Sequence, residues 1–356
     1  DMGGAHPGSM APAADIHGEG LRIPPVMLVR KGIVDPGILA MFLANTRVPH
    51  ERHADLLAPW SACQVGVKRM RSLMAEYGAT QLAARALELI DWTEERTRLM
   101  LGDLPRGTWS VEDTLELAAG GQATLRLEWT LSKNRCRFDF RASDPAVLDG
   151  INTVHAVVLS AVHYCVRLLL PDGTPTNGGI ARCVEVLTRP GSVIDASYPS
   201  PVAAGNVETS QRLVDLVLAA FRCALPDVLP AASAGTMSNL TLGAPDGSWS
   251  YYETLAGGAG GGPAGSGAHA VHTHMTNTRN TPVEVFERAV PLRVLSTTVR
   301  RDSGGQGRAR GGDGITRRLL ALAQIKVGWS AQRQKSGPPG AFGGGSGASG
   351  GAEVRR

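Results

Sequence analysis

The chain has 356 residues, of which 43% are hydrophobic and 19% charged, and its formal net charge is +4. This composition allows a substantial core, and no apolar run approaches the roughly 18 residues of a membrane-spanning helix. The mild positive charge comes without a dense Lys/Arg run, so it does not indicate a nucleic-acid partner. The 44 Gly and 22 Pro residues are clustered, which predicts long ordered loops around a packed centre.

The first part of the chain is predicted to be a loop followed by helices. Asp35 followed by Pro36 is typical of a helix start, because the carboxylate caps backbone N–H groups and proline suits the first helical position. The pattern stays helical to about residue 101, and Pro49 and Gly78 divide it into three helices. The apolar face of the third helix is expected to contain Leu82, Ala86, Leu89 and Ile90.

The hydrophobic period changes to two between residues 107 and 143. Apolar residues at 125, 127, 129 and 131, and again at 136, 138 and 140, alternate with polar ones, and Lys133-Asn134 separates the two runs. This pattern predicts an antiparallel hairpin with one buried face. Apolar helices are expected at 151–170 and 211–225, with short strands around 182–187.

Short elements between glycine-rich turns are predicted for the C-terminal part. Residues 281–284, Thr-Pro-Val-Glu, have the spacing of a capping box that opens a helix, and short strands follow from residue 292. The fold class is therefore α+β, a helical segment packed beside mixed, mainly antiparallel sheets with Gly-rich loops. The expected divisions are an N-terminal loop and helical segment at 1–105, a mixed α+β domain at 106–335, and a poorly ordered Gly-rich tail at 336–356.

The glycine run at 257–262 is either a phosphate-binding loop or a tight turn. Gly260, Gly262 and Gly265 match G-x-G-x-x-G, but Pro263 interrupts the run, no amphipathic helix follows, and no Walker loop occurs in the chain. A turn that another backbone or a ligand approaches closely is the stronger interpretation, with Gly258 as a substrate-binding candidate. The single Arg-Ala-Arg-Gly-Gly copy at 308–312 has no nearby aromatic residue and does not indicate RNA binding.

Imidazole and polar side chains follow the glycine run at 268–280. On a strand, His272 and His274 would face one side, where two imidazoles can hold a metal or one can act as a general base. The alternative is a structural hydrogen-bond network, since buried polar groups need partners in either case. The catalytic candidates in this segment are His274, Asn277 and Arg279.

Residues 205–210 precede the second apolar helix and allow two interpretations. In the first, Asn206 is the N-cap and Glu208 lies near the positive end of the helix dipole. In the second, Asn206 and Glu208 point into a site at that helix terminus and bind substrate or water.

Four possible metal ligands fall within the first nineteen residues: Asp1, His6, His17 and Glu19. Carboxylate and imidazole ligands together suit Mn, Fe or Zn.

The order of the motifs along nearly the whole chain resembles the hydantoinase B family, which includes N-methylhydantoinase and 5-oxoprolinase beta-type subunits. Related members are alpha-type subunits of acetone and acetophenone carboxylases. The resemblance is carried by Asp1-Met2-Gly3-Gly4, Glu19-Gly20-Leu21-Arg22-Ile23-Pro24-Pro25, Asn45-Thr46-Arg47-Val48-Pro49, Asp139-Phe140, Gly205-Asn206-Val207-Glu208-Thr209-Ser210-Gln211, Tyr252-Glu253, Thr273-His274-Met275-Thr276-Asn277-Thr278-Arg279 and Ser303-Gly304-Gly305.

The resemblance implies an ATP-dependent, two-component enzyme that opens a cyclic amide such as a hydantoin or 5-oxoproline. A hydantoinase A-type partner would bind ATP and activate the amide oxygen, and this chain would complete ring opening by water attack. In the family, Asp1 closes a motif whose histidines would lie upstream, so the chain corresponds to the C-terminal two thirds of a longer subunit. A divalent metal (Mn, Fe or Zn) is implied for some members, with Asp1 and His17 as ligand candidates.

Two other functions stay open at this point. The same residues could serve in an ATP-dependent ketone carboxylase, or the chain could be an inactive fragment that only binds its partner. The resemblance implies a hetero-oligomer. A cytoplasmic location is expected, because no targeting segment is visible and the five cysteines contain no Cys-x-x-Cys pair. No nucleic-acid or membrane partner is expected.

Overall fold

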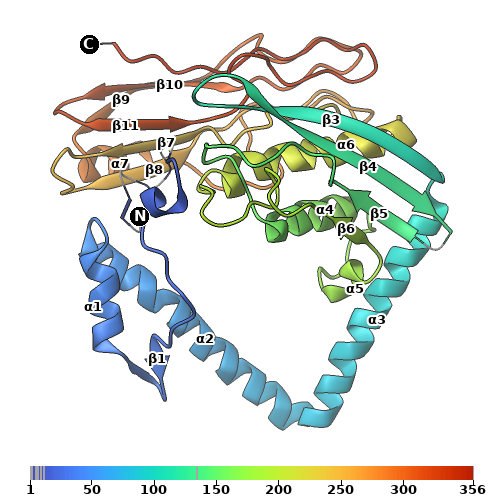
Figure 1. Ribbon diagram of the computed structural model, residues 1–356, viewed down its shortest axis with the longest axis horizontal. Coiled ribbons are helices and arrows are strands. Elements are labelled where there is room, and N and C mark those ends of the chain that lie inside the picture. Colours follow the sequence, from blue (N-terminus) through green and yellow to red (C-terminus); the bar gives the residue numbers. More distant parts are fainter. Residues whose placement is uncertain (1–2, 5–7, 9, 11–12, 134, 356) are drawn as a thin grey trace.

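The computed structural model describes residues 3–4, 8, 10, 13–133 and 135–355, and it has three visible parts (Figure 1). Two long helices form an arm, a four-stranded sheet covers two buried helices, and a second group of strands carries the glycine-rich loops. The α+β class and the mainly antiparallel sheets are confirmed. No helix in the described part is long and apolar enough to cross a membrane.

The N-terminal part contains a 3₁₀ turn (Ile16–Glu19), a small ladder of β1 (Val29–Arg30) with β2 (Ile33–Val34), and then α1 (Pro36–Ala44). The predicted start of α1 is confirmed, since the Asp35 carboxylate accepts hydrogen bonds from the backbone N–H groups of Gly37 and Ile38. The predicted division into three helices is also confirmed, with α2 (Pro49–Tyr77) and α3 (Ala79–Asp103) following α1.

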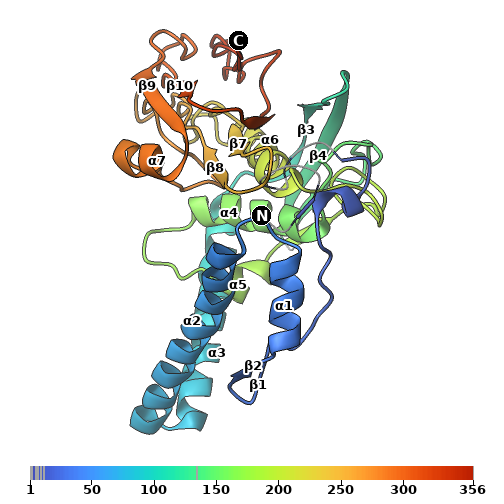
Figure 2. The same cartoon turned by 90° about the vertical axis from the view of Figure 1, so that its left-hand side faces the viewer.

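Helices α2 and α3 meet at Gly78 and diverge from this corner (Figure 1). Both project away from the rest of the molecule (Figure 2). The predicted buried face of α3 is wrong in part, because Leu89 is 48% exposed while Thr93, Thr97 and Leu101 are buried. Only the later turns of α3 reach the body, where they pack against α5 (Gly178–Ala181).

The first sheet has the strand order β3–β4–β5–β6, formed by β3 (Gly107–Glu116), β4 (Gln122–Ser132), β5 (Arg135–Asp139) and β6 (Glu185–Leu187). The predicted hairpin is the β4–β5 pair, with Trp129 opposite Phe138, and both side chains are fully buried. Strand β6 joins β5 in parallel, so the sheet is mixed. Helices α4 (His155–Leu169) and α6 (Ser210–Ala224) cover its apolar face.

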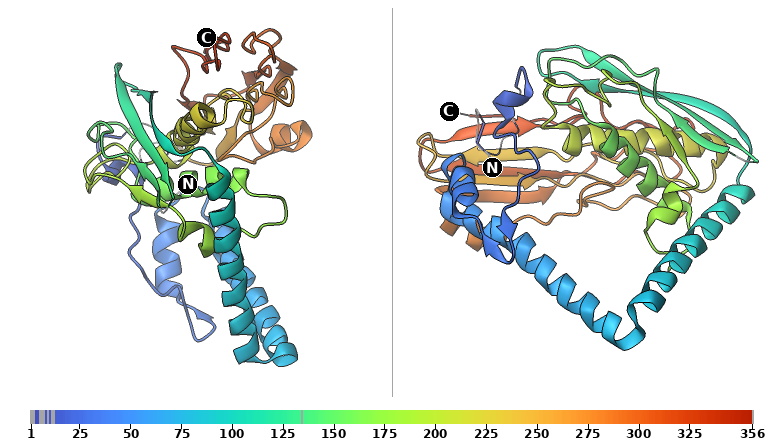
Figure 3. Two further views of the ribbon diagram at one scale, coloured as in Figure 1. Left: turned by 90° about the vertical axis from the view of Figure 1, so that its right-hand side faces the viewer. Right: turned by 60° about the horizontal axis from the view of Figure 1, so that its bottom comes forward.

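The C-terminal part contains the sheet β11–β7–β8, made of β11 (Lys326–Ser330), β7 (Asn239–Gly243) and β8 (Ser250–Thr254), and the pair β9 (Leu292–Val299) with β10 (Ile315–Ala321). Helix α7 (Val283–Ala289) begins where the capping box was predicted, but its N-cap residue is Pro282 and no side chain caps it. The hydroxyl of Thr281 instead lies 3.0 Å from that of Tyr251. Helix α6 lies between the two groups of strands (Figure 3).

Candidate active site

The entry to α6 brings polar side chains into the interior. A π-helical segment, Gly205–Thr209, precedes α6, and the N-cap of α6 is Thr209, so the interpretation of Asn206 as the N-cap is wrong. A glycine is required at 205, because a Cβ there would lie 2.1 Å from the carbonyl oxygen of Asn152. The extra residue of the π turn leaves the Asn206 side chain exposed and Glu208 fully buried.

Glu208 accepts three hydrogen bonds at the buried end of this segment. The Thr236 hydroxyl donates to Oε2 at 2.7 Å, and the Asn239 side-chain amide and the Met237 backbone N–H donate to Oε1 at 2.6 and 3.2 Å. Burial nevertheless raises the pKa of Glu208 to about 7, because the loss of hydration outweighs these donors. A carboxyl group with such a pKa can exchange a proton near neutral pH.

One face of α6 carries two further buried polar side chains, Arg212 four residues after Glu208 and Asp215 three residues after Arg212. Nη1 of Arg212 lies 3.1 Å from the carboxylate of Asp113, and Nη2 of Arg333 lies 2.8 Å from the same group. Asp215 is fully buried in the interior beside them, and neither of its carboxylate oxygens has a hydrogen-bond partner in the described residues. Burial raises the pKa of Asp215, while His274 and the two arginines oppose that rise.

His274 faces this carboxylate from the loop after the glycine run. Its Nε2 lies 3.9 Å from Oδ1 of Asp215, and its Nδ1 lies 3.3 Å from the hydroxyl of Tyr164 on α4. Burial lowers the pKa of His274, and the negative charge of Asp215 partly counteracts this. The imidazole is therefore neutral at pH 7 and available as a proton acceptor.

His272 and His274 do not lie on a strand, so the shared face considered for them does not form. The last sheet-like contact is the bridge of Val271 with Gly257, after which the chain turns and His274 adopts a positive φ of 58°. A hydrogen bond of 3.0 Å from the Gln211 side chain to the carbonyl of Thr273 ties this turn to α6. The turn, rather than an alternating strand, therefore directs His274 toward Asp215.

The other two catalytic candidates do not join this cluster. Asn277 and Arg279 are exposed, and neither makes a hydrogen bond or ion pair with any residue that the structure describes. Their neighbours in the loop point elsewhere: Thr278 contacts Thr254, and Asn280 donates to Glu253. Of the predicted catalytic and substrate-binding residues, Glu208 and His274 are thus the two that lie in the polar cluster beside α6.

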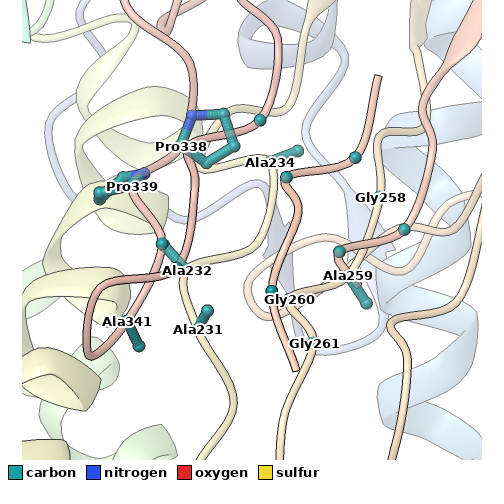
Figure 4. A pocket seen from close by; sticks show the side chains of 18 of the residues that line it. Ala231, Ala232, Ala234, Gly258, Ala259, Gly260, Gly261, Pro338, Pro339 and Ala341 are labelled. Carbon is teal, nitrogen blue, oxygen red and sulfur yellow. The ribbon is translucent and has the colours of Figure 1, made fainter. Parts of the chain in front are cut away.

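A cavity of about 560 Å³ lies beside this cluster, walled by glycine-rich segments (Figure 4). Residues 256–263, 303–309, 311–312, 338–345, 347–348 and 350 line it, together with Thr236 and Arg333. A Cβ on Gly258 would lie 1.9 Å from the carbonyl oxygen of Gly312, which confirms the tight turn that another backbone approaches. The tail is part of this packing, since Gly345 and Ala348 donate backbone hydrogen bonds to Gln306 and Ser303.

The expected metal ligands do not form a site within the described residues. Asp1 and His6 lie outside those residues. His17 is exposed, with its Nε2 at 3.0 Å from the hydroxyl of Tyr198, and Glu19 accepts the backbone N–H groups of residues 202 and 203. No group of three or more His, Cys, Asp or Glu side chains suited to a metal occurs in the described part of the chain.

Sequence reasoning missed Asp113, Asp215 and Arg333. The available signal was Asp215, a charged residue within an otherwise apolar stretch of the helix and seven positions after Glu208. Its partners could not be found in this way, because they lie about a hundred residues away on either side.

Comparison with known proteins defines the class. The family model described as Hydantoinase B/oxoprolinase matches residues 1–356, and the chain belongs to this family. A 5-oxoprolinase of Dictyostelium discoideum is 34% identical over 352 residues, covering 97% of this chain and 27% of that protein. An uncharacterised protein of Methanocaldococcus jannaschii is 33% identical over 98% of this chain and 62% of its own length.

Solved structures show the same fold. An ATP-dependent caprolactamase from Pseudomonas jessenii has a TM-score of 0.82 at 28% identity, covering 92% of this chain and 58% of that one. A nucleotide-free acetone carboxylase structure has a TM-score of 0.86 at 18% identity, covering 98% and 50%. The chain thus spans less than two thirds of each of these relatives.

Proposed function

We propose that this chain is part of an ATP-dependent amidohydrolase that opens a cyclic amide, such as a hydantoin, 5-oxoproline or a related lactam. The observation that carries the proposal is the similarity to 5-oxoprolinases and to an ATP-dependent caprolactamase over more than nine tenths of the chain. ATP is bound by a hydantoinase A-type partner that activates the amide oxygen. The absence of a Walker loop from this sequence agrees with that division of labour.

The chemistry assigned to this chain is the addition of water to the activated carbonyl carbon. A water O–H bond breaks as the new C–O bond forms, and the neutral imidazole of His274 accepts the proton. The carboxylate of Asp215, 3.9 Å from Nε2, stabilises the resulting imidazolium. The ring C–N bond then breaks, and the leaving nitrogen takes the proton back from His274. The phosphoryl group that ATP placed on the amide oxygen passes to a second water, so the products are the ring-opened carboxylic acid and inorganic phosphate.

Glu208 acts as a positioning residue in this proposal. It holds the hydroxyl of Thr236, which lines the glycine-walled cavity and also accepts the backbone N–H of Gln332 at 3.1 Å. Asn206 and Gly258 remain predictions as substrate-binding residues.

The test is ATP hydrolysis by the full-length subunit purified with its hydantoinase A-type partner, in the presence of hydantoin, 5-oxoproline, or acetone with bicarbonate. Stimulation by a cyclic amide supports the proposal, whereas stimulation only by ketone with bicarbonate assigns the chain to the carboxylase branch. His274→Ala is expected to lower turnover by at least about 100-fold, the contribution of a positioned general base. His272→Ala, two positions away in the same loop, is the matched control and should retain activity.

A further inference from the structure

The loop that carries His274 has an unfavourable backbone conformation. Ala270 and His274 have positive φ values of 52° and 58°, in the left-handed region that is uncommon for residues other than glycine. Such a conformation persists only where surrounding contacts fix the chain. On the N-terminal side, the side chain of Gln211 donates to the carbonyl of Thr273, next to His274. A second set of contacts is therefore expected on the C-terminal side.

Alternate residues after His274 connect the chain to β8. Oγ1 of Thr276, which is buried, lies 3.3 Å from Oγ1 of Thr278. Oγ1 of Thr278 lies 2.5 Å from Oγ1 of Thr254, the last residue of β8. The side-chain amide of Asn280 donates to the carbonyl oxygen of Thr254 at 2.9 Å. These contacts hold the chain from two to six residues after His274.

Asn280 ends this series at a buried ion pair. Its amide also donates to Oε2 of Glu253 at 3.0 Å, and the hydroxyl of Tyr251 donates to the same oxygen at 2.9 Å. Oε1 of Glu253 lies 3.1 Å from Nε of Arg317 on β10, and these two side chains are 4% and 3% exposed. The guanidinium carbon of Arg317 lies 5.4 Å from the centre of the Phe286 ring on α7. Glu253 therefore joins the loop to β10 and α7.

The ion pair is better suited to orientation than to stability. Desolvation of two buried charges largely offsets their attraction, so such a pair contributes little net stability. A carboxylate held at Oε1 by a guanidinium presents its other oxygen in a fixed direction, and Oε2 of Glu253 faces Asn280. Within the described residues, Glu253 and Arg317 form no other ion pair.

We propose that Asn280 is a positioning residue for His274. Held by Glu253, it fixes the C-terminal side of the loop, so that the turn keeps the imidazole beside Asp215. Asn280 acts through His274 rather than on the substrate. Its effect on turnover rests on the proposed function, in which His274 is the general base, whereas the placement of the imidazole does not depend on the reaction.

Asn280→Ala tests the placement of the imidazole. The change removes both hydrogen bonds of the amide but leaves Glu253 in contact with Arg317 and Tyr251, so no buried charge loses its partner. Burial lowers the pKa of His274. A loosened loop exposes the ring, so the pKa of His274 measured by NMR should rise toward its ordinary value of 6.5.

Two further variants support this measurement. Thr278→Val removes the hydroxyl that meets Thr254, and it should raise the pKa of His274 in the same direction. Asn45→Ala is the matched control, because it removes one side-chain hydrogen bond at the end of α1, and it should leave that pKa unchanged. Far-UV circular dichroism verifies that each variant is folded, and Thr278→Val alone decides if Asn280→Ala is not.

Turnover by the full-length subunit with its hydantoinase A-type partner is the second measurement. Asn280→Ala should lower kcat by about 10-fold or more, up to the roughly 100-fold cost of a 1 Å misplacement. KM should stay within about 2-fold, because the substrate loses no contact. In the His274→Ala background, Asn280→Ala should cause no further loss, since the group that it positions is gone.

Three outcomes overturn the proposal. The first is a pKa of His274 that the loop variants leave unchanged. The second is an unchanged kcat in Asn280→Ala when His274→Ala is impaired, and the third is a loss that Asn280→Ala adds to that of His274→Ala. Full turnover by His274→Ala would instead refute the proposed role of His274 as the base, and the pKa of His274 in the loop variants would then decide the placement by itself.

Discussion

Replacing Glu208 with glutamine is expected to remove one specific part of the pH dependence of folding. The carboxyl group is fully buried, and its pKa rises from the ordinary 4.5 to about 7 because burial removes its hydration. The native state therefore holds a proton that the unfolded chain releases above pH 4.5. The stability from this group is fully present below pH 4.5 and is lost as the pH rises through 7.

The size of the effect follows from the two pKa values. The rise from 4.5 to about 7 corresponds to about 3 kcal/mol between acidic pH and pH 8. Glutamine does not titrate. Between acidic pH and pH 8, the natural chain should therefore lose about 3 kcal/mol of unfolding free energy relative to Glu208→Gln. Glutamine also brings an N–H where Thr236, Met237 and Asn239 all donate, which adds a pH-independent loss of about 1–3 kcal/mol.

The assay is urea unfolding followed by tryptophan fluorescence at half-unit steps between pH 4.5 and 8.5. Other buried acids titrate in both proteins and cancel in the difference. Glu112→Gln, on β3 with a side chain 69% exposed, is the matched control for the exchange of a carboxylate for an amide. A free-energy difference for Glu208→Gln that is the same at pH 5 and pH 8 would refute the reasoning, because the carboxylate would then be ionised in the fold.

Three further predictions concern packing and charge. Trp129→Ala should lower the unfolding free energy by about 3–5 kcal/mol in urea titrations, since this fully buried ring stacks in the core; a loss below 1 kcal/mol would contradict that role. Gly258→Ala should lower the melting temperature, since its Cβ would lie 1.9 Å from a carbonyl oxygen, whereas Gly351→Ala, with nothing within 4 Å, should not. Asp215→Asn should lower the NMR-measured pKa of His274 further, since the charge that favours the imidazolium is removed; an unchanged pKa would show that the two groups do not interact.

Local patterns were sufficient for much of the fold. The carboxylate of Asp35 before a proline, and the breaks at Pro49 and Gly78, predict the boundaries of the first three helices because capping and backbone restriction act within a few residues. The period of two around Trp129 predicts the β4–β5 hairpin, because alternate side chains of a strand share one face. The family motifs likewise are short and read directly from the chain.

Local patterns failed where a distant segment competes for the same group. The predicted capping role of Thr281 is absent because its hydroxyl meets Tyr251 across the fold. The helical period of α3 identified an apolar face around Leu89, but it carries no information on whether anything covers that face.

Periodicity, capping and short motifs are sufficient for the α+β class, the family, and the placement of Glu208 and His274 in polar motifs beside apolar helices. The folded arrangement is needed to show that His274 faces Asp215 and that Asp113 contacts Arg212 and Arg333 across 99 and 220 residues of chain. Such pairs depend on how sheets and helices stack, whereas the periodicity of side chains reports only on the element that contains them. The glycine-walled cavity has the same origin, since Gly258, Gly260 and Gly312 are each required by a backbone that approaches from another segment.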